Sequence, residues 1–403
     1  MPERSRRLIE EGRLDQTLEH LIPVLARAAQ ESDKQSSFPF EGIQAVHDAG
    51  LLELTVAKRY GGPEISASTL TRVIIALGQG DPTVALISLM TLFTHWQQTT
   101  KALWADHLYK RILEGTDKQQ PVLLNSARVE PSLGSPARGG IPETTATPTE
   151  AGWRIKGSKR FVTGSEGLTW FLVWASTDET PPRVGTFIVP ADSQGIHITR
   201  NWNSLGMRGT VSHDVDFIDV IVGKDDVIGL VGADAGQQDN SGKALTNLII
   251  TALYVGVAEA AQQAFIDFAE ERIPSNLGYP IARTERFINL AGEIDLLVGG
   301  ARQLILDAVD HHGDQADVLL RARILAGRQL REAVQLALRA LGNPGLSGNR
   351  ELERHFRNIQ SVLVHAPQED TVISILGNRV FNLNSTGRKA QKKKNVDGAV
   401  NEH

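Results

Sequence analysis

The sequence contains no cysteine, which excludes disulfide bonds, thiolate metal sites and a cysteine nucleophile. Redox chemistry would therefore need a bound cofactor. Several binding motifs are also missing, because no GxGxxG follows an expected strand and neither GxxxxGK[ST] nor HExxH occurs. The 42 Lys and Arg residues do not exceed the 47 Asp and Glu residues, which gives a formal net charge of −5. This balance argues against nucleic acid as a partner.

Long hydrophobic runs are absent as well. The longest charge-free apolar stretch, residues 245–258, is shorter than the ~18–20 residues that span a bilayer, so it predicts a buried helix and no membrane partner. The first residues lack the apolar core of a signal peptide and are too acidic for a transit peptide. We therefore expect a cytoplasmic protein. No metal site is expected either, because the adjacent His311 and His312 would point about 100° apart on a helix.

The hydrophobic pattern divides the chain into zones. Apolar residues recur at helical spacing before about residue 120 and again after about residue 243, whereas residues 121–236 contain short runs with period two. Asp81 and Pro82 have the side chains of a helix cap and a first helical residue. The pattern predicts an α+β protein with an N-terminal helical domain (1–120), a middle domain of antiparallel strands (121–236), a C-terminal helical domain (237–383) and a flexible basic tail (384–403).

Four segments carry a resemblance to a known family. They are IQAVHDAGLLELTVAKRYGG, VEPSLGS, KGSKRFVTG and LGMRGTVSHDVDFIDVIV, in that order. Together they resemble the acyl-CoA dehydrogenase superfamily of flavoproteins, and the similarity runs from about residue 38 to residue 381. The resemblance implies the three-domain fold of that family, with a C-terminal four-helix bundle. It also implies a flavin, either FMN or FAD, between the β domain and the C-terminal helices.

The same resemblance assigns residues to the flavin. Phe161 would pack on the isoalloxazine ring and Thr163 would donate a hydrogen bond to it, which suits a flat heterocycle whose electronics are tuned by fixed donors. Asn125 and Ser126 would approach the ring edge, and Ser135 would bind a flavin phosphate. From the residues alone, we would favour an inward strand residue at Phe161 and a turn former at Thr163.

Two further segments imply an assembly. Arg272 falls where the family has an arginine that reaches the flavin phosphates of a neighbouring subunit, and a guanidinium suits that bidentate task. The LGNPG turn, residues 341–345, matches a second such segment but departs from the family's double-glycine turn. The resemblance thus implies a homotetramer built as a dimer of dimers.

The carboxylate base of an acyl-CoA dehydrogenase has no counterpart in this sequence. Position-by-position matching places Ala366 where the family's glutamate stands and Thr246 at the family's alternative position. Neither side chain is a strong base at neutral pH. Glu369, one helical turn beyond Ala366, is the nearby carboxylate that could replace it.

His365 stands beside this gap, in the segment RHFRNIQSVLVHAPQED. That segment resembles the flavin-dependent monooxygenase branch of the superfamily, which includes dibenzothiophene monooxygenase and sulfur-acquisition relatives and takes reduced flavin from a separate reductase. Histidine suits the proton-handling role that such enzymes need. We expect Pro367 to open the following helix, whose N-terminus would favour a neutral imidazole at His365. His95 matches a second active-site histidine of this branch, although it could also be a core histidine.

Three functions stay open at this stage. The first is a two-component monooxygenase that uses reduced flavin and O₂ on a small organosulfur, amine or aromatic substrate. The second is an FAD-dependent acyl-CoA dehydrogenase with a relocated base. The third is a flavin-binding protein that has lost its catalytic activity. The missing base favours the first and third, and the two histidines favour the first over the third.

Overall fold

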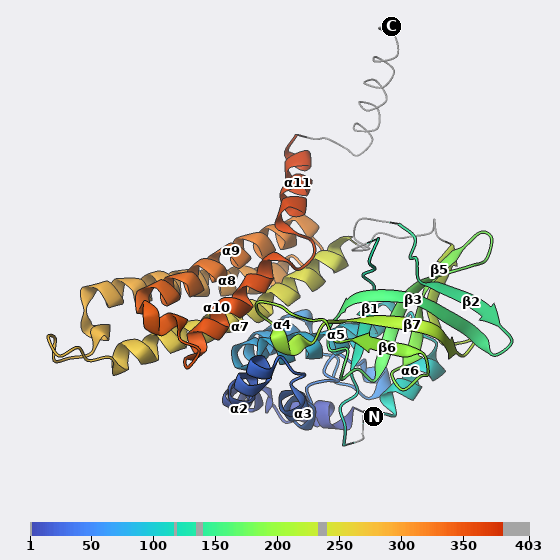
Figure 1. Ribbon diagram of the computed structural model, residues 1–403, viewed down its shortest axis with the longest axis horizontal. Coiled ribbons are helices and arrows are strands. Elements are labelled where there is room, and N and C mark those ends of the chain that lie inside the picture. The colour runs from blue at the N-terminus through green and yellow to red at the C-terminus, as the bar shows by residue number, and fades with distance from the viewer. Residues whose placement is uncertain (1, 117–118, 134–139, 233–239, 382–403) are drawn as a thin grey trace, which may run out of the picture.

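The computed structural model describes residues 2–116, 119–133, 140–232 and 240–381. It confirms the expected α+β fold, in which helices precede and follow a sheet (Figure 1). Ser135 and the tail 384–403 lie outside the described residues. The N-terminal helices are α1 (Glu3–Glu10), α2 (Leu14–Gln35), α3 (Phe40–Asp48), α4 (Ala67–Gly80), α5 (Pro82–Lys101) and α6 (Asp106–Leu113).

Helix α5 begins where the sequence predicts. Pro82 is its first residue, and the Asp81 carboxylate accepts a hydrogen bond of 2.8 Å from the Thr83 amide. This cap satisfies one of the amides that a helix start leaves free. Most residues of α5 are buried, as expected for a helix that is apolar on nearly every side.

One sheet forms the middle of the chain. Its strands are β1 (Leu124–Ala127), β2 (Thr145–Thr149), β3 (Gly152–Val162), β4 (Trp170–Thr177), β5 (Arg183–Pro190), β6 (Ile196–Thr199), β7 (His213–Val222) and β8 (Val227–Gly232). The strand order is β6-β7-β3-β2-β4-β5-β8, with β1 also paired to β4. The expectation of antiparallel strands needs a correction, because β1 and β2 each run parallel to β4. Both pairings join strands that are not consecutive, and the two-residue period does not reveal strand direction.

The C-terminal helices form the predicted bundle. The helices α7 (Asn240–Glu271), α8 (Glu285–His311), α9 (Ala316–Leu341) and the short α10 (Glu351–Ile359) pack against one another, while α11 (Glu369–Val380) projects from them (Figure 1). Helix α7 is long and apolar enough to cross a membrane by composition alone, but 67% of its most apolar window is buried inside the protein. It therefore packs as the predicted core helix.

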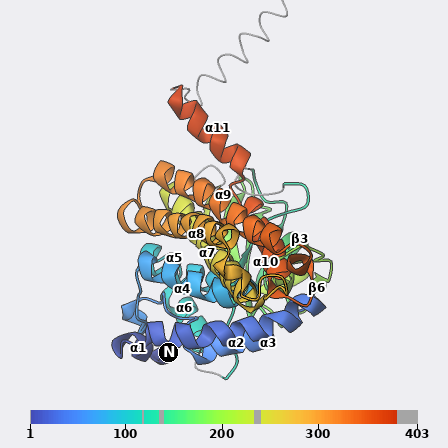
Figure 2. The ribbon, with the colours of Figure 1, turned by 90° about the vertical axis from the view of Figure 1, so that its left-hand side faces the viewer.

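The bundle lies directly on the N-terminal helices (Figure 2). Helices α4 and α7 cross so closely that a Cβ added at Gly78 would lie 2.2 Å from the Leu253 carbonyl oxygen. A Cβ added at Gly256 would lie 2.1 Å from the Ile75 carbonyl oxygen. Glycine is needed at both crossing points because the two backbones leave no room for a side chain.

A polar clamp joins α10 to α2 and to the loop before β7. The Arg357 guanidinium donates to both carboxylate oxygens of Asp33, at 3.0 and 2.6 Å, and to the Leu205 carbonyl at 3.3 Å. The next residue, Asn358, accepts a hydrogen bond of 2.7 Å from the Met207 amide. This clamp positions the loop against the helices.

Candidate functional site

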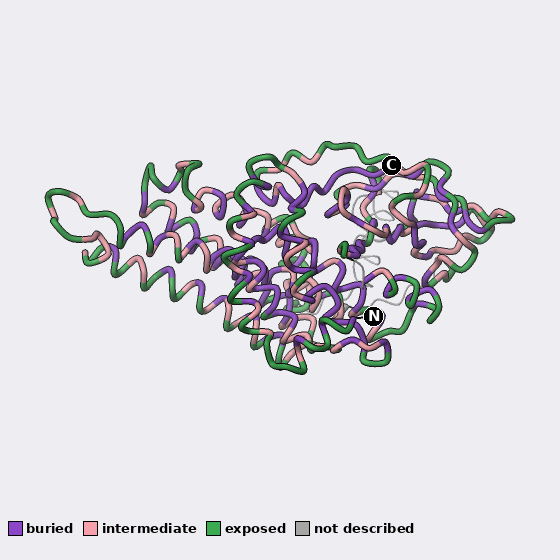
Figure 3. The backbone as a smooth tube through the Cα atoms, turned by 90° about the horizontal axis from the view of Figure 1, so that it is seen from below, coloured by how far each residue is buried: buried purple, intermediate pink, exposed green. Residues whose placement is uncertain are grey.

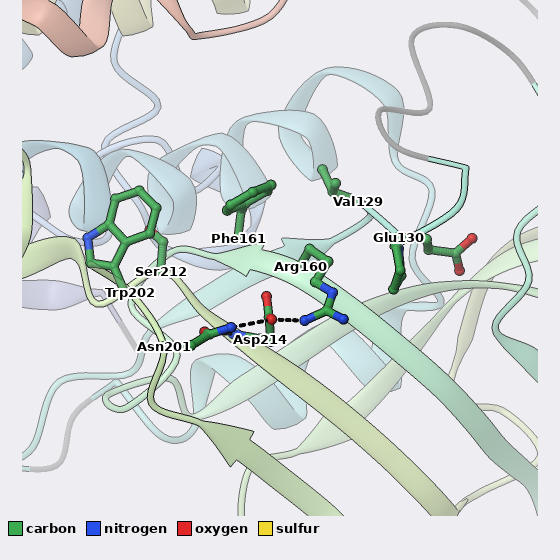
Figure 4. A pocket seen from close by; sticks show the side chains of 9 residues that line it. Val129, Glu130, Arg160, Phe161, Asn201, Trp202, Ser212 and Asp214 are labelled. Carbon is green, nitrogen blue, oxygen red and sulfur yellow. Dashed lines mark hydrogen bonds and ion pairs between the residues drawn. The ribbon is translucent and has the colours of Figure 1, made fainter. Parts of the chain in front are cut away.

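A cavity of about 480 Å³ opens beside the end of β3 (Figure 4). Its walls come from β3, from the segment before β2, and from β7 with the loop that precedes it. The lining residues are Val129, Glu130, Pro131, Arg160, Phe161, Asn201, Trp202, Ser212 and Asp214. The volume and the two aromatic side chains suit a flat organic ligand.

Phe161 is the most unusual residue of this cavity. It is 63% exposed, and its backbone is left-handed, with φ of 55°, at an irregularity in the pairing of β3 with β7. A bulky residue in that conformation costs about 1–3 kcal/mol and persists only where its surroundings enforce it. Its ring lies 6.3 Å from that of Trp202 in an edge-to-face arrangement. The bend thus presents an aromatic face to the cavity.

A series of hydroxyl and amide groups extends from the lining residue Ser212 to Thr163 and Asn125. The Asn125 amide donates to the Thr163 carbonyl at 2.9 Å, and the Ser212 hydroxyl donates to Thr163 Oγ1 at 3.2 Å. Because Thr163 Oγ1 accepts from Ser212, its own proton remains available for a ligand. The structure therefore brings Asn125, Thr163 and Phe161 together, whereas Ser126 is exposed on β1.

The charged groups of the cavity are paired. Asp214 forms an ion pair with Arg160 and accepts a hydrogen bond from the Asn201 amide (Figure 4). The Asp214 amide in turn donates to Asn201 Oδ1 at 3.1 Å. A ligand would thus meet a nearly neutral surface at this wall.

Of the lining residues, the sequence resemblance assigns a role to Phe161 alone, and Asn201 and Trp202 lie outside all four segments that carry the resemblance. Trp202 is held by its indole N–H, which donates to the Met207 carbonyl at 3.2 Å. A tryptophan between two asparagines in a loop is the signal that could have identified this wall.

His365 lies in the C-terminal domain, where its Nε2 is 2.6 Å from the Tyr254 hydroxyl. Burial, followed by the charge of Arg323, lowers the pKa of His365 to about 4, so the imidazole is neutral at pH 7. Burial also raises the pKa of Tyr254, which keeps its proton and can donate it to His365. Arg323 donates to the His365 carbonyl at 2.5 Å. Among the described residues, these contacts hold His365 within the bundle, and none of them is with the cavity at Phe161.

The expected helix start at Pro367 is wrong. Helix α11 begins at Glu369 with Gln368 as its cap residue, so His365 stands four residues before the first turn. Its neutrality follows from burial and Arg323 rather than from a helix dipole, because dipole effects fall off within the first turn.

Glu369, the carboxylate that could replace the missing base, is paired with Arg328. Its carboxylate accepts a hydrogen bond of 2.9 Å from Arg328 Nε on α9, within an ion pair. This contact holds the carboxylate against α9. Thr246 donates its hydroxyl to the Gly242 carbonyl within α7. Neither residue presents an unpaired base.

His95 is buried on α5, with its Nδ1 2.8 Å from the hydroxyl of Tyr109 on α6. Burial lowers its pKa to about 4. Its Nε2 has no hydrogen-bond partner among the described residues. The rings of Tyr60 and Trp104 also pack on Tyr109, so His95 borders an aromatic cluster rather than the cavity at Phe161.

Arg272 follows the last residue of α7, at the end of the bundle that points away from the sheet (Figure 1). The residue is exposed, in a turn that is largely open to solvent (Figure 3). The LGNPG turn between α9 and α10 lies at the same end. A 32-residue helix is about 48 Å long, so Arg272 is far from the Phe161 of its own chain.

No group of three or more potential metal ligands occurs in the part of the chain that the structure describes. His311 is exposed at the last turn of α8 and His312 is the residue that caps it.

Three family models match the chain. They are the acyl-CoA dehydrogenase N-terminal domain at residues 16–103, the middle domain at residues 127–220 and the C-terminal domain at residues 248–369. Among curated proteins, a putative acyl-CoA dehydrogenase YdbM of Bacillus subtilis (strain 168) is 29% identical over 363 residues, which cover 88% of this chain and 93% of that protein.

Solved structures of different activities share the fold. The FMN and indole complex of TdsC from Paenibacillus sp. A11-2 has a TM-score of 0.80 at 22% identity and covers 92% of this chain and 97% of that one. Butyryl-CoA dehydrogenase from Megasphaera elsdenii has a TM-score of 0.78 at 19% identity, with coverage of 91% and 97%. KijD3 with FMN and a dTDP-amino-keto sugar has a TM-score of 0.78 at 22% identity, with coverage of 92% and 93%.

Proposed function

Because the chain belongs to the acyl-CoA dehydrogenase superfamily of flavoproteins, we propose that it is a flavin-dependent oxidoreductase acting on a small molecule. Within this class we favour a two-component monooxygenase that takes reduced flavin and O₂. The neutral His365 carries this assignment, since it stands beside two positions that lack the dehydrogenase base.

The cavity at Phe161 fits a flavin ring. Phe161 and Trp202 offer aromatic surfaces inclined at 76°, and Thr163 offers a hydroxyl proton, because its oxygen already accepts from Ser212. A flavin held there, FMN or FAD, would supply the electrons for activating O₂. The pairing of Asp214 with Arg160 leaves no uncompensated charge from these two groups against the ring.

His365 would hold and move a proton. A pKa of about 4 makes the imidazole a weak base at neutral pH, so its role would be to donate a proton. Nε2 accepts from the Tyr254 hydroxyl at 2.6 Å, which orients the ring and leaves the ring proton on Nδ1. The contacts of His365 with Tyr254 and Arg323 come from α7 and α9, so the residue is fixed by two long helices rather than by its own loop. We propose that His365 approaches the bound flavin from this position.

The partners follow from the same proposal. Reduced flavin would come from a separate reductase, and the substrate would be a small organosulfur, amine or aromatic compound. Arg272 lies too far from its own Phe161 to join that site, which supports a shared site in a homotetramer. Because TdsC binds indole together with FMN, indole is a suitable first compound with which to probe the substrate class.

The test mixes the protein with chemically reduced FMN and oxygen in a stopped-flow spectrometer. A monooxygenase should give a protein-dependent absorbance transient that differs from both reduced and oxidised flavin. With an oxygenated substrate, His365→Ala should slow oxygenation by about 10²–10⁴-fold and release hydrogen peroxide instead. Glu369→Gln, the matched control, should leave turnover nearly unchanged.

A dehydrogenase is the second candidate, favoured by the similarity to the putative acyl-CoA dehydrogenase YdbM. It would need Glu369 to leave Arg328 and act as the base. Anaerobic reduction of the flavin by an acyl-CoA, lost in Glu369→Gln and retained in His365→Ala, would support it over the monooxygenase. A protein that binds flavin yet shows neither reaction would instead be a flavin-binding protein without catalysis.

A further inference from the structure

A buried ion pair lies behind one wall of the cavity. Lys159 on β3 is 0% exposed and Glu130 is 2% exposed, and Lys159 Nζ is 2.6 Å from Glu130 Oε1. The ammonium also donates to the Trp174 carbonyl at 2.6 Å. Burial lowers the pKa of Lys159 to about 8, and the opposing effect of Glu130 does not fully offset it.

Glu130 is hydrogen-bonded to Glu143 and Thr144, just before β2. Its Oε1 accepts from the Thr144 amide at 2.9 Å and from the Thr144 hydroxyl at 2.6 Å, and its Oε2 accepts from the Glu143 amide at 2.8 Å. One carboxylate thus receives three hydrogen bonds from residues 143 and 144 besides that from Lys159. The Glu130 carboxylate therefore joins the segment after β1 to the residues just before β2.

The ion pair also connects two walls of the cavity. Val129, Glu130 and Pro131 line one wall, and Phe161 on the other wall is two residues after Lys159. The Arg160 amide donates to the Val129 carbonyl at 2.9 Å, which fixes the backbones beside the pair. Any change in the distance between Lys159 and Glu130 therefore displaces one wall relative to Phe161.

A buried ion pair is weak evidence for stability, because the desolvation of two charges often exceeds their attraction. A well-packed apolar pair would serve the core as well. The four hydrogen bonds that Glu130 accepts indicate instead that the pair fixes the position of the surrounding backbone. Arg128, whose guanidinium stacks over the Trp174 ring, is the other charged group that acts on Lys159, and it opposes the protonated form.

We propose that Lys159 and Glu130 are positioning residues that hold the Val129–Pro131 wall at a fixed distance from Phe161 and thereby set flavin affinity. This inference rests on the proposed flavin site. The pair acts through the wall and does not touch the reacting atoms. Removing the pair should therefore change the affinity for flavin and the environment of the bound flavin ring.

The experiment compares four single variants of the full chain, Glu130→Gln among them, and the double variant Glu130→Gln with Lys159→Met. Lys159→Met removes the ammonium, and Thr144→Val removes one hydroxyl donor to Glu130 while conserving shape. Arg302→Met is the control away from the cavity, because it breaks the half-buried ion pair of Arg302 on α8 with Glu259 on α7, whose atoms are 2.5 Å apart. The FMN dissociation constant is measured by fluorescence titration, the visible spectrum of bound FMN is recorded, and the melting temperature is determined without flavin.

We expect Lys159→Met to raise the FMN dissociation constant by about tenfold or more, and Thr144→Val by about threefold to tenfold. The bound-flavin spectrum should shift toward that of free FMN. Glu130→Gln combined with Lys159→Met should weaken binding by less than the sum of the two single changes, since the unpaired buried charge is then removed. Arg302→Met should lower the melting temperature with no change in FMN affinity.

Two results would overturn the inference. If Thr144→Val and the folded fraction of Lys159→Met bind FMN as the wild type does, with only the melting temperature reduced, the pair merely stabilises the fold and the proposed function is unaffected. If the wild type binds neither FMN nor FAD, the proposed function fails and this inference fails with it. Thr144→Val keeps the test decisive even if Lys159→Met does not fold.

Discussion

Three histidines with lowered pKa values should make the protein sensitive to acid. Burial lowers the pKa of His95 to about 4, and burial together with the charges of Arg354 and Arg357 lowers that of His355 to about 3. The unfolded chain binds these protons near pH 6.5 and the folded chain does not. Stability is therefore complete above pH 6.5 and is lost as the pH falls from there toward each folded pKa.

The size of the loss in stability follows from the two pH units between the unfolded pKa of 6.5 and pH 4.5. At pH 4.5 each histidine is almost fully protonated in the unfolded chain and largely neutral in the folded one. At ~1.4 kcal/mol per pKa unit, each costs about 3 kcal/mol, and His365, whose pKa is also lowered to about 4, adds a similar amount, so the three histidines together cost about 8 kcal/mol. That is comparable with the total stability of many proteins. Urea unfolding followed by circular dichroism at pH 7.5 and pH 4.5 measures the difference.

His355→Met isolates one of the three contributions. The His355 side chain is 3% exposed, and neither ring nitrogen has a hydrogen-bond partner among the described residues, so an apolar replacement leaves no donor unpaired. We expect the variant to be as stable as the wild type at pH 7.5 and to lose about 3 kcal/mol less at pH 4.5. Equal losses in the two proteins would refute the reasoning.

Three other predictions concern the cofactor, the assembly and the packing. Arg272→Ala should weaken flavin binding by roughly one to two decades through the loss of a charge-assisted contact, and an unchanged dissociation constant would contradict its assignment. Light scattering should find a tetramer, whereas a flavin-loaded single chain would exclude a shared site. Gly78→Val should cost about 1–3 kcal/mol in thermal unfolding because its Cβ would overlap the Leu253 carbonyl, and a stability equal to that of the wild type would show that α4 and α7 can separate.

The sequence predicts the fold better than the site. Long periodic segments identify the helices and five strands, but β1 and β8 each pair with a strand that is not their neighbour in the sequence, and β2 does so for one of its two partners. Local pattern carries little information about such pairings. The α5 cap was readable because Asp81 and Pro82 act locally.

The site depends on contacts that local sequence does not contain. Phe161 and Thr163 are named through resemblance; Phe161 lines the cavity with Arg160, and Thr163 is hydrogen-bonded to the lining residue Ser212. Trp202 reaches the same cavity from about 40 residues later only because the loop is held by α10. The helix start expected at Pro367 was placed two residues early, since tertiary contacts of His365 decide where the chain turns.

The clamp on Arg357 gives the first helices a remote influence on the cavity. Asp33 of α2 holds Arg357, which with Asn358 fixes the backbone at Leu205 and Met207, and the Met207 carbonyl holds the Trp202 indole. A proteolytic cut or an engineered start after residue 36 would remove the first member of this chain of contacts. Such a shortened protein would have an altered aromatic wall although every residue that lines the cavity would still be present.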